Sequence, residues 1–259
     1  MRADLYLSTF GHAQSRKKAQ DLIAAGAVKI DGIEIKKSSV LINEEVPHTV
    51  DIEEVFKYVS RGGMKLEGAL NAFRVNVNGK KAVDVGASTG GFTDCLLQRG
   101  AARVYSVDSG IGQLHEKLRA DSRVTCIEKF NARELTAEMT EGECDIAVCD
   151  VSFISQTYII PGISAAVRQG GEFVSLIKPQ FEAGRSALGK GGIVHSGAYR
   201  YLAVKRVLEC AIANGFDCVG LIPSPIEGGD GNKEYLAYFV KRPCVRCAVD
   251  DKTMRFITR

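Results

Sequence analysis

Residues 83–92 read VDVGASTGGF, an apolar run that leads into a glycine-rich turn and the start of a helix. In nucleotide-binding α/β sheets, a corner of this kind lies at the carboxyl end of a strand. Its glycine spacing, G-x-x-x-G-G, differs from the G-x-G-x-x-G of dinucleotide folds, and the turn lacks the Gly-Lys-Ser/Thr of a P-loop. The pattern therefore disfavours both NAD and ATP as the ligand.

An acidic residue completes this corner. Asp108 ends the next apolar segment, where a carboxylate can accept hydrogen bonds from both hydroxyls of a ribose. The two features favour an adenosine ligand without phosphates, and S-adenosylmethionine fits, with its ammonium attracted to Asp84 or its neighbours and its carboxylate to the turn amides or the helix start. Asn131 is expected to reach the adenine. The expected cofactor-binding residues are Asp84, Gly86, Ser88, Gly90, Gly91, Asp108 and Asn131.

The chain around this corner alternates strand, turn and helix, which predicts an α/β fold with a Rossmann-like parallel sheet and helices on both faces. We expect a helix over residues 65–73, and a mobile loop over the glycine-rich residues 182–197. The expected strands are residues 82–85, 104–107, 146–149, 173–177, 218–221 and 235–240.

The first part of the chain carries an excess of basic residues. Residues 1–42 hold seven Lys or Arg against four Asp or Glu. Ser15 can cap a helix over 16–25, Gly26 can end it, and residues 28–35 predict a hairpin around Asp31-Gly32. A basic helix face beside a short hairpin offers cations to phosphates, although an ordinary solvated face explains the charges equally well. The expected RNA-binding residues are Arg2, Arg16, Lys17, Lys18, Lys36 and Lys37.

This N-terminal part resembles the S4 RNA-binding domain. The resemblance rests on RxDxxL at residues 2–7 and SRxxAxxLIxxGxVxIxG at residues 15–32. It implies a small α+β module over residues 1–60 that binds RNA. A larger domain over residues 61–243 and a C-terminal tail over residues 244–259 then follow.

Four charged residues stand where a parallel sheet places its ligands. Asp150 and Lys178 directly follow apolar strands, Glu234 begins the last strand, and Lys65 lies on the helix before the first one. An antiparallel last strand would bring Glu234 to the same edge of the sheet as the others. We therefore expect the four side chains to form one reaction site.

The order of these four residues resembles the K-D-K-E tetrad of FtsJ-type ribose 2′-O-methyltransferases. The strings SRGGxKL (60–66), CDVSFIS (149–155) and IKPQFE (177–182) resemble the TlyA family, and the match spans almost the whole chain. That family joins an S4 domain to a class I methyltransferase sheet and methylates cytidine ribose in ribosomal RNA, so the resemblance implies this substrate, with ribosomal RNA or ribosomal subunits as the partner.

Transfer of a methyl group to a 2′-hydroxyl requires a base that removes the hydroxyl proton. We assign this role to Lys178, provided that partial burial and the like charge of Lys65 lower its pKa. Asp150 and Glu234 oppose that shift. Their expected role is to orient the lysines and the ribose by hydrogen bonds.

Composition narrows the remaining alternatives. A net charge of +3 does not by itself indicate a nucleic-acid partner, and no run of apolar residues is long enough to span a membrane. The scattered cysteines suit a reducing cytoplasm, and neither the histidines nor the lone C-x-x-C of Cys244 and Cys247 has the spacing of a metal site. Rival functions are a non-enzymatic RNA-binding protein, a pseudouridine synthase and a membrane-active haemolysin. The oligomeric state stays open.

Overall fold

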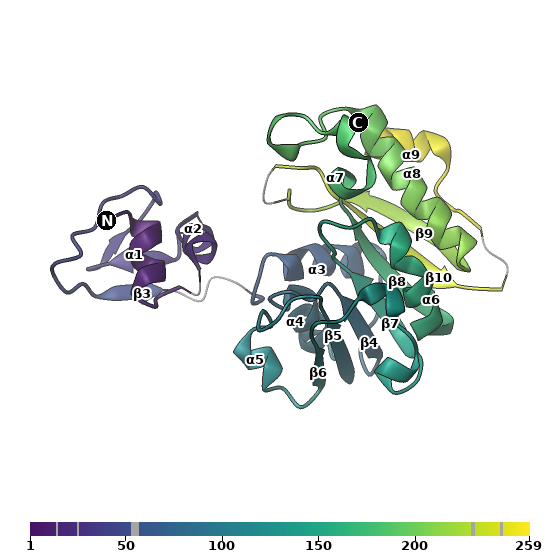
Figure 1. The fold of residues 1–259 in the computed structure, drawn as a ribbon, viewed down its shortest axis with the longest axis horizontal. Helices are drawn as coiled ribbons and strands as arrows, with labels where there is room; N and C mark the ends of the chain where they lie inside the picture. Colours follow the sequence, from purple (N-terminus) through teal and green to yellow (C-terminus); the bar gives the residue numbers. More distant parts are fainter. Residues whose placement is uncertain (14, 25, 53–56, 229–230, 244–245) are drawn as a thin grey trace. The chain divides into compact units, whose positions relative to one another are not determined.

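The computed structural model describes residues 1–13, 15–24, 26–52, 57–228, 231–243 and 246–259. These residues form two compact units, Met1–Lys57 and Tyr58–Arg259, and each unit has its own apolar core (Figure 1). The division falls close to the boundary expected after residue 60. Cys244 of the C-x-x-C pair lies outside the described residues.

The first unit is a small α+β module, as expected. Its helices are α1 (Ala3–Thr9) and α2 (Arg16–Ala24), and its antiparallel sheet has the order β2 (Ile33–Glu34), β1 (Val28–Ile30), β3 (Val50–Ile52). Ser15 Oγ accepts the backbone N–H of Lys18 at 3.1 Å, which confirms the predicted cap. Asp31 and Gly32 have φ values of 52° and 77°, as a type I′ turn requires, so the predicted hairpin is also confirmed.

A fully buried carboxylate connects the two helices of this unit. Asp4 accepts hydrogen bonds from Arg2 Nε at 3.0 Å, Arg16 Nε at 2.9 Å and Gln20 Nε2 at 2.7 Å. These bonds, that of Arg2 above all, hold the pKa of Asp4 well below its usual range. Arg2 and Arg16 are among the expected RNA-binding residues. Their Nε groups bind Asp4, because a buried carboxylate has to be paired, and their side chains remain 45% and 52% exposed.

The second unit is an α/β fold around a seven-stranded sheet with the order β6-β5-β4-β7-β8-β10-β9. The pairs among β4, β5, β6, β7 and β8 are parallel, whereas β10 is antiparallel to both of its neighbours. The strands are β4 (Lys81–Val85), β5 (Arg103–Val107), β6 (Val124–Ile127), β7 (Cys144–Cys149), β8 (Val167–Ile177), β9 (Phe216–Pro223) and β10 (Tyr235–Lys241).

Every strand expected from the sequence is present, and β6 is an addition. It is a four-residue edge strand that is only half-buried, so it lacks the continuous apolar run of the central strands. The expected helix over 65–73 is also confirmed, with bounds of Gly62–Ala72.

Helices cover both faces of the sheet (Figure 1). One core contains residues of α3, α4 and α5, and the other contains residues of α6, α8 and α9. The helices are α3 (Gly62–Ala72), α4 (Gly91–Gln98), α5 (Glu116–Arg119), α6 (Ile160–Ala166), α7 (Pro179–Glu182), α8 (Gly197–Ala213) and α9 (Asp251–Ile257). Within the described part of the chain, none of them is long and apolar enough to cross a membrane.

The glycine-rich residues 182–197 contain two short 3-10 helices, η4 (Arg185–Ala187) and η5 (Lys190–Gly192). The backbone of Val194 in this loop forms hydrogen bonds with the side chains of Asn232 and Arg200, which connect the loop to the rest of the unit. Residues of the expected tail form α9, which packs on α8, so this segment belongs to the second unit.

The Asp4 network predicts acid sensitivity of the first unit. Because pairing lowers the pKa of Asp4, its stabilisation is complete above the ordinary carboxyl pKa of about 4 and is lost progressively as the pH falls from that value towards the lower pKa of the folded state. Amide hydrogen exchange of α1 and α2, corrected for intrinsic rates, should therefore accelerate from pH 6 to pH 3. Asp4→Asn should remove most of this pH dependence, and the exposed Asp51→Asn should retain it. Equal pH profiles for the two variants would contradict the assignment.

Candidate active site

The turn between β4 and α4 leaves no space for a side chain at Gly86. This residue has a φ of 84°, and a Cβ placed on it would lie 2.6 Å from the backbone oxygen of Asp150 and 2.9 Å from Val151 Cγ1. Gly90 has a φ of 93° and lies against Leu118. The glycines therefore let the turn lie directly against the segment that follows β7.

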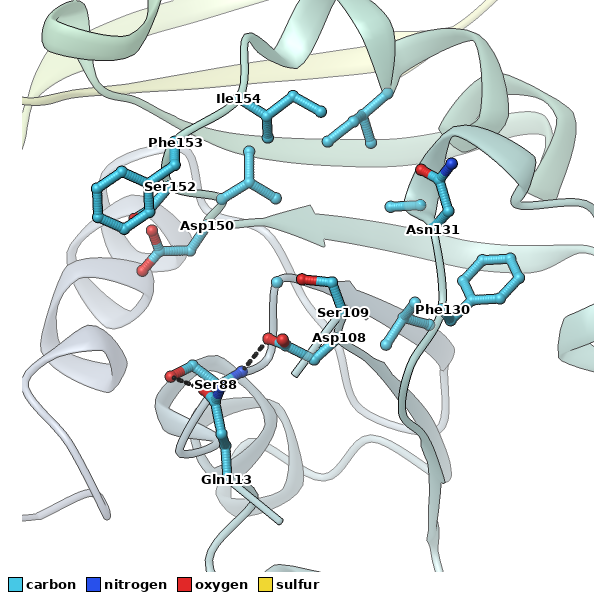
Figure 2. A pocket seen from close by; sticks show the side chains of 15 residues that line it. Ser88, Asp108, Ser109, Gln113, Phe130, Asn131, Asp150, Ser152, Phe153 and Ile154 are labelled. Carbon is cyan, nitrogen blue, oxygen red and sulfur yellow. Dashed lines mark hydrogen bonds between the residues drawn. The ribbon is translucent and has the colours of Figure 1, made fainter. Parts of the chain in front are cut away.

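Asp108 at the end of β5 is held by the backbone. One carboxylate oxygen accepts the N–H group of Ser88 at 2.7 Å (Figure 2), and the other accepts that of Gly110, also at 2.7 Å. Each oxygen keeps a further lone pair. The carboxylate therefore has a fixed direction and can still accept the hydroxyls of a ribose.

Asp84 has a different position from the one expected. It is fully buried, accepts a 2.7 Å hydrogen bond from Thr93 Oγ1, and does not belong to the lining of the cavity. Burial raises the pKa of Asp84 to about 7. The side chain thus lies beneath the turn and supports the start of α4, rather than facing a ligand directly.

A cavity of about 370 Å³ opens above this turn. Its volume lies within the usual range for small-molecule sites, and its walls combine apolar groups with the Asp108 carboxylate (Figure 2). Gly90 and Gly91 shape the turn without lining the cavity. The expected residues that do line it are Gly86, Ser88, Asp108, Asn131 and Asp150.

The four expected reaction residues form two ion pairs. Lys65 pairs with Glu234, and both are buried. Lys178 Nζ lies 2.6 Å from Asp150 Oδ1 and donates a 2.9 Å hydrogen bond to Ser152 Oγ. Lys65, Lys178 and Glu234 line a second cavity of about 400 Å³. This second cavity shares Ser152 and Phe153 with the first, so the tetrad lies beside the expected cofactor position.

Phe153, which the sequence did not single out, stands on the wall shared by the two cavities. Its side chain is 91% exposed, and its φ of 65° is a conformation that bulky residues rarely adopt. The ring lies 5.2 Å from that of Phe181. A strained, exposed aromatic at a site is typical of functional positions. The only sequence signal is an apolar residue inside the short segment that follows β7.

A buried network fixes the segments that carry Asp150 and Lys178. Glu182 accepts a hydrogen bond from Ser155 Oγ at 2.5 Å and one from the backbone N–H of Gln156 at 2.8 Å. Gln156 in turn donates to the backbone oxygen of Leu176 at 2.6 Å. Burial raises the pKa of Glu182. These bonds join the loop after β7 to the end of β8, so they hold the segments of Asp150 and Lys178 together.

All but one of the expected RNA-binding residues are exposed on the first unit, namely Arg2, Arg16, Lys17, Lys36 and Lys37, and Lys18 is half-buried. In the described ranges, no three His, Cys, Asp or Glu side chains gather as a metal site would require.

Comparison with known proteins matches both units to families. The S4 domain matches residues 1–46, and the FtsJ-like methyltransferase family matches residues 58–241. Over 237 residues, the chain is 43% identical to the 16S/23S rRNA (cytidine-2′-O)-methyltransferase TlyA of Mycobacterium tuberculosis, which covers 92% of this chain and 88% of that protein.

Two further relatives bear the haemolysin name. Hemolysin A of Brachyspira hyodysenteriae is 44% identical over 241 residues, 93% of this chain and 100% of the relative. A solved structure of a putative hemolysin from Streptococcus thermophilus has a TM-score of 0.80 and 38% identity, and the match covers 100% of this chain and 94% of that chain.

The close approach at Gly86 predicts that a side chain at this position would weaken cofactor binding. Gly86→Ala would push a methyl group against the Asp150 backbone, and we expect S-adenosylmethionine to bind at least about tenfold more weakly, as a distortion of roughly 1.4 kcal/mol would produce. Gly79→Ala is the matched control, since Gly79 has a similar φ of 72° but nothing within 4 Å of its Cβ position. Calorimetry measures the affinity and thermal unfolding the stability. The same affinity in both variants would refute the role of this approach.

Proposed function

The chain belongs to the TlyA family, whose members join an S4 domain to an FtsJ-like methyltransferase domain, and on that premise we propose that it methylates the 2′-hydroxyl of cytidine ribose in ribosomal RNA. The observation that carries the proposal is the placement of Lys65, Lys178 and Glu234 around one cavity, directly beside the cavity with Asp108. The name of the Mycobacterium tuberculosis relative supports cytidine in ribosomal RNA as the substrate.

S-adenosylmethionine fits the first cavity. Asp108 would accept the ribose hydroxyls, the backbone around Gly86 would admit the amino-acid part without a clash, and Asn131 would reach the adenine. When bound, this cofactor supplies a methyl group on a positively charged sulfur, which an oxygen nucleophile can attack. The residues of the protein then have to position that oxygen and accept its proton.

The second cavity would hold the acceptor ribose. Lys178, at the junction of both cavities through Ser152, is the proposed base. Only a neutral amine can accept the hydroxyl proton, so Lys178 would act as the base in its neutral form. Asp150 and Ser152 hold its nitrogen in place. Glu234 and Asp150 orient the two lysines.

The S4 unit would supply affinity for the phosphate backbone of the RNA. Its exposed Lys17, Lys36 and Lys37 can contact phosphates without reading sequence. Ribosomal RNA or a ribosomal subunit is thus the proposed partner, and the cytoplasm is the proposed location.

Mass-spectrometric mapping of ribose methylation tests the proposal. Ribosomal RNA from cells with and without this protein, and RNA treated with the purified protein and S-adenosylmethionine, should differ by methyl groups on cytidine ribose. The position of the methyl group decides between alternatives. Methylation of a base, or of no ribosomal RNA at all, would refute the proposed function.

The proposed base predicts a selective loss of the chemical step. Lys178→Ala should still bind S-adenosylmethionine, but its single-turnover rate with saturating RNA should fall by about 10² to 10⁴, the usual contribution of a positioned base. Lys178→Arg should not restore the rate, because guanidinium stays protonated. A near-normal rate for Lys178→Ala would reject the base role and leave positioning as the source of catalysis.

A further inference from the structure

One wall of the second cavity is formed by the glycine-rich loop. Gly191, Gly192 and Leu188 line that wall, and the same cavity is also lined by Lys65 and Lys178 of the tetrad. The buried Asn232 holds this loop from below: its Oδ1 accepts the backbone N–H of Val194 at 3.0 Å, and its Nδ2 donates to the backbone oxygen of Gly192 at 3.2 Å. The loop is thereby fastened to a residue two positions before Glu234.

A second anchor of the same loop is Arg200 on α8. Its guanidinium donates to the backbone oxygens of Val194 at 2.8 Å and His195 at 2.7 Å. Arg200 is only 6% exposed, and the hydrogen bonds of its guanidinium group go to backbone oxygens. A buried cation of this kind is tolerated only when its N–H groups are satisfied. Here backbone oxygens satisfy them.

The remaining acceptor of Arg200 comes from a distant segment. Arg200 Nε donates to the backbone oxygen of Thr258 at 3.1 Å, 58 residues further along the chain. Thr258 is 1% exposed and donates its own hydroxyl to Met254 at 2.9 Å. Beside it, Lys233 donates to the backbone oxygen of Arg259 at 3.1 Å. Residues 258–259 therefore contact both Arg200 and the neighbour of Glu234.

The helix α9 brings these residues to α8 (Figure 1). Asp250 caps α9 by accepting the backbone N–H of Thr253 at 2.7 Å, and Tyr201 on α8 donates to Asp251. Gly197 at the start of α8 lies close to this segment, since a Cβ there would be 3.2 Å from the backbone oxygen of Thr258. Two independent contacts thus seat residues 251–259 on α8.

We infer that residues 251–259 and Arg200 together set the position of the loop wall of the acceptor cavity. Arg200 is a positioning residue for the acceptor ribose, and Thr258 is the acceptor that holds Arg200 in place. The inference rests on the proposed function, because it takes the second cavity as the ribose site. It extends that site by a segment that lies outside the region matched to the FtsJ-like family, residues 58–241.

Loss of the Arg200 hydrogen bonds should affect the acceptor cavity and not the cofactor cavity. The cofactor cavity is lined by residues at the ends of β4, β5 and β7 and in the segments after β4, β5, β6 and β7, and it contains none of the loop residues that Arg200 holds. A shift of the loop wall would misplace the ribose oxygen, and misplacement by about 1 Å can reduce a rate by about 10²-fold. Cofactor binding would stay unchanged.

The test uses the full chain with Arg200→Met, which keeps much of the side-chain length but removes the donors. We expect the single-turnover rate with saturating RNA to fall by about 10-fold to 100-fold, with the S-adenosylmethionine dissociation constant within about twofold of wild type. The matched control is Arg242→Met, which removes a 2.9 Å ion pair with Asp217 elsewhere in the same unit and should leave the rate unchanged.

A second variant keeps the inference testable if Arg200→Met fails to fold. A chain that stops after Ile257 lacks the Thr258 acceptor while retaining Arg200, and its rate should fall in the same selective way. Combined with Arg200→Met, its effect should be less than the sum of the two, because both changes break one connection.

The outcomes separate the two hypotheses. A wild-type protein that does not methylate RNA refutes the proposed function. A wild-type protein that is active, with Arg200→Met or the shortened chain at wild-type rate, refutes the inference alone. Parallel losses of cofactor affinity, thermal stability and rate would also refute it, since they would indicate a general structural role.

Discussion

The direction of one strand determines whether a reaction site can exist in this sheet. β4, β7 and β8 run parallel and bring their carboxyl ends to one edge, where Asp150 and Lys178 follow β7 and β8. β10 is antiparallel to β8, with Tyr235 opposite Ile177, so the start of β10 lies at that same edge. Glu234 precedes Tyr235 and can therefore meet Lys65 of α3. With a parallel β10, Glu234 would lie at the opposite edge.

Local patterns were sufficient for much of the fold and for the tetrad. The glycine turn, the apolar central strands and the charged residues at strand ends are all encoded within a few positions, so their places on the sheet edge followed from the rule that parallel strands share an edge. The resemblance to a known family then indicated the chemistry. The sequence alone leaves the direction of the last strand open, and the pairing of β10 with β8 shows that it is antiparallel.

Contacts between distant residues could not be obtained in this way. The hydrogen bond of Arg16 Nε to Asp4 joins residues twelve positions apart, and no local pattern in the sequence indicates it. Asp84 was expected to face a ligand, but the packing of α4 buries it. β6 is too short and too exposed for its sequence to be distinguished from that of a loop. The hydrogen bond from Arg200 to the backbone oxygen of Thr258 joins segments 58 residues apart. Each case depends on tertiary packing that has no periodic signal in the sequence.

The two ion pairs of the tetrad differ in how far water reaches their carboxylates. Glu234 has a side chain that is 3% exposed, whereas that of Asp150 is 21% exposed. Removal of Lys65 would leave Glu234 as a buried carboxylate without its partner, which typically costs about 3–5 kcal/mol. Removal of Lys178 would leave Asp150 in partial contact with water, so the cost to stability should be smaller. The Lys65–Glu234 pair is thus suited to hold the geometry of the site. Lys178 contacts Ser152 on the wall shared by the two cavities and can change with less disturbance of the fold, which agrees with its proposed role in the reaction.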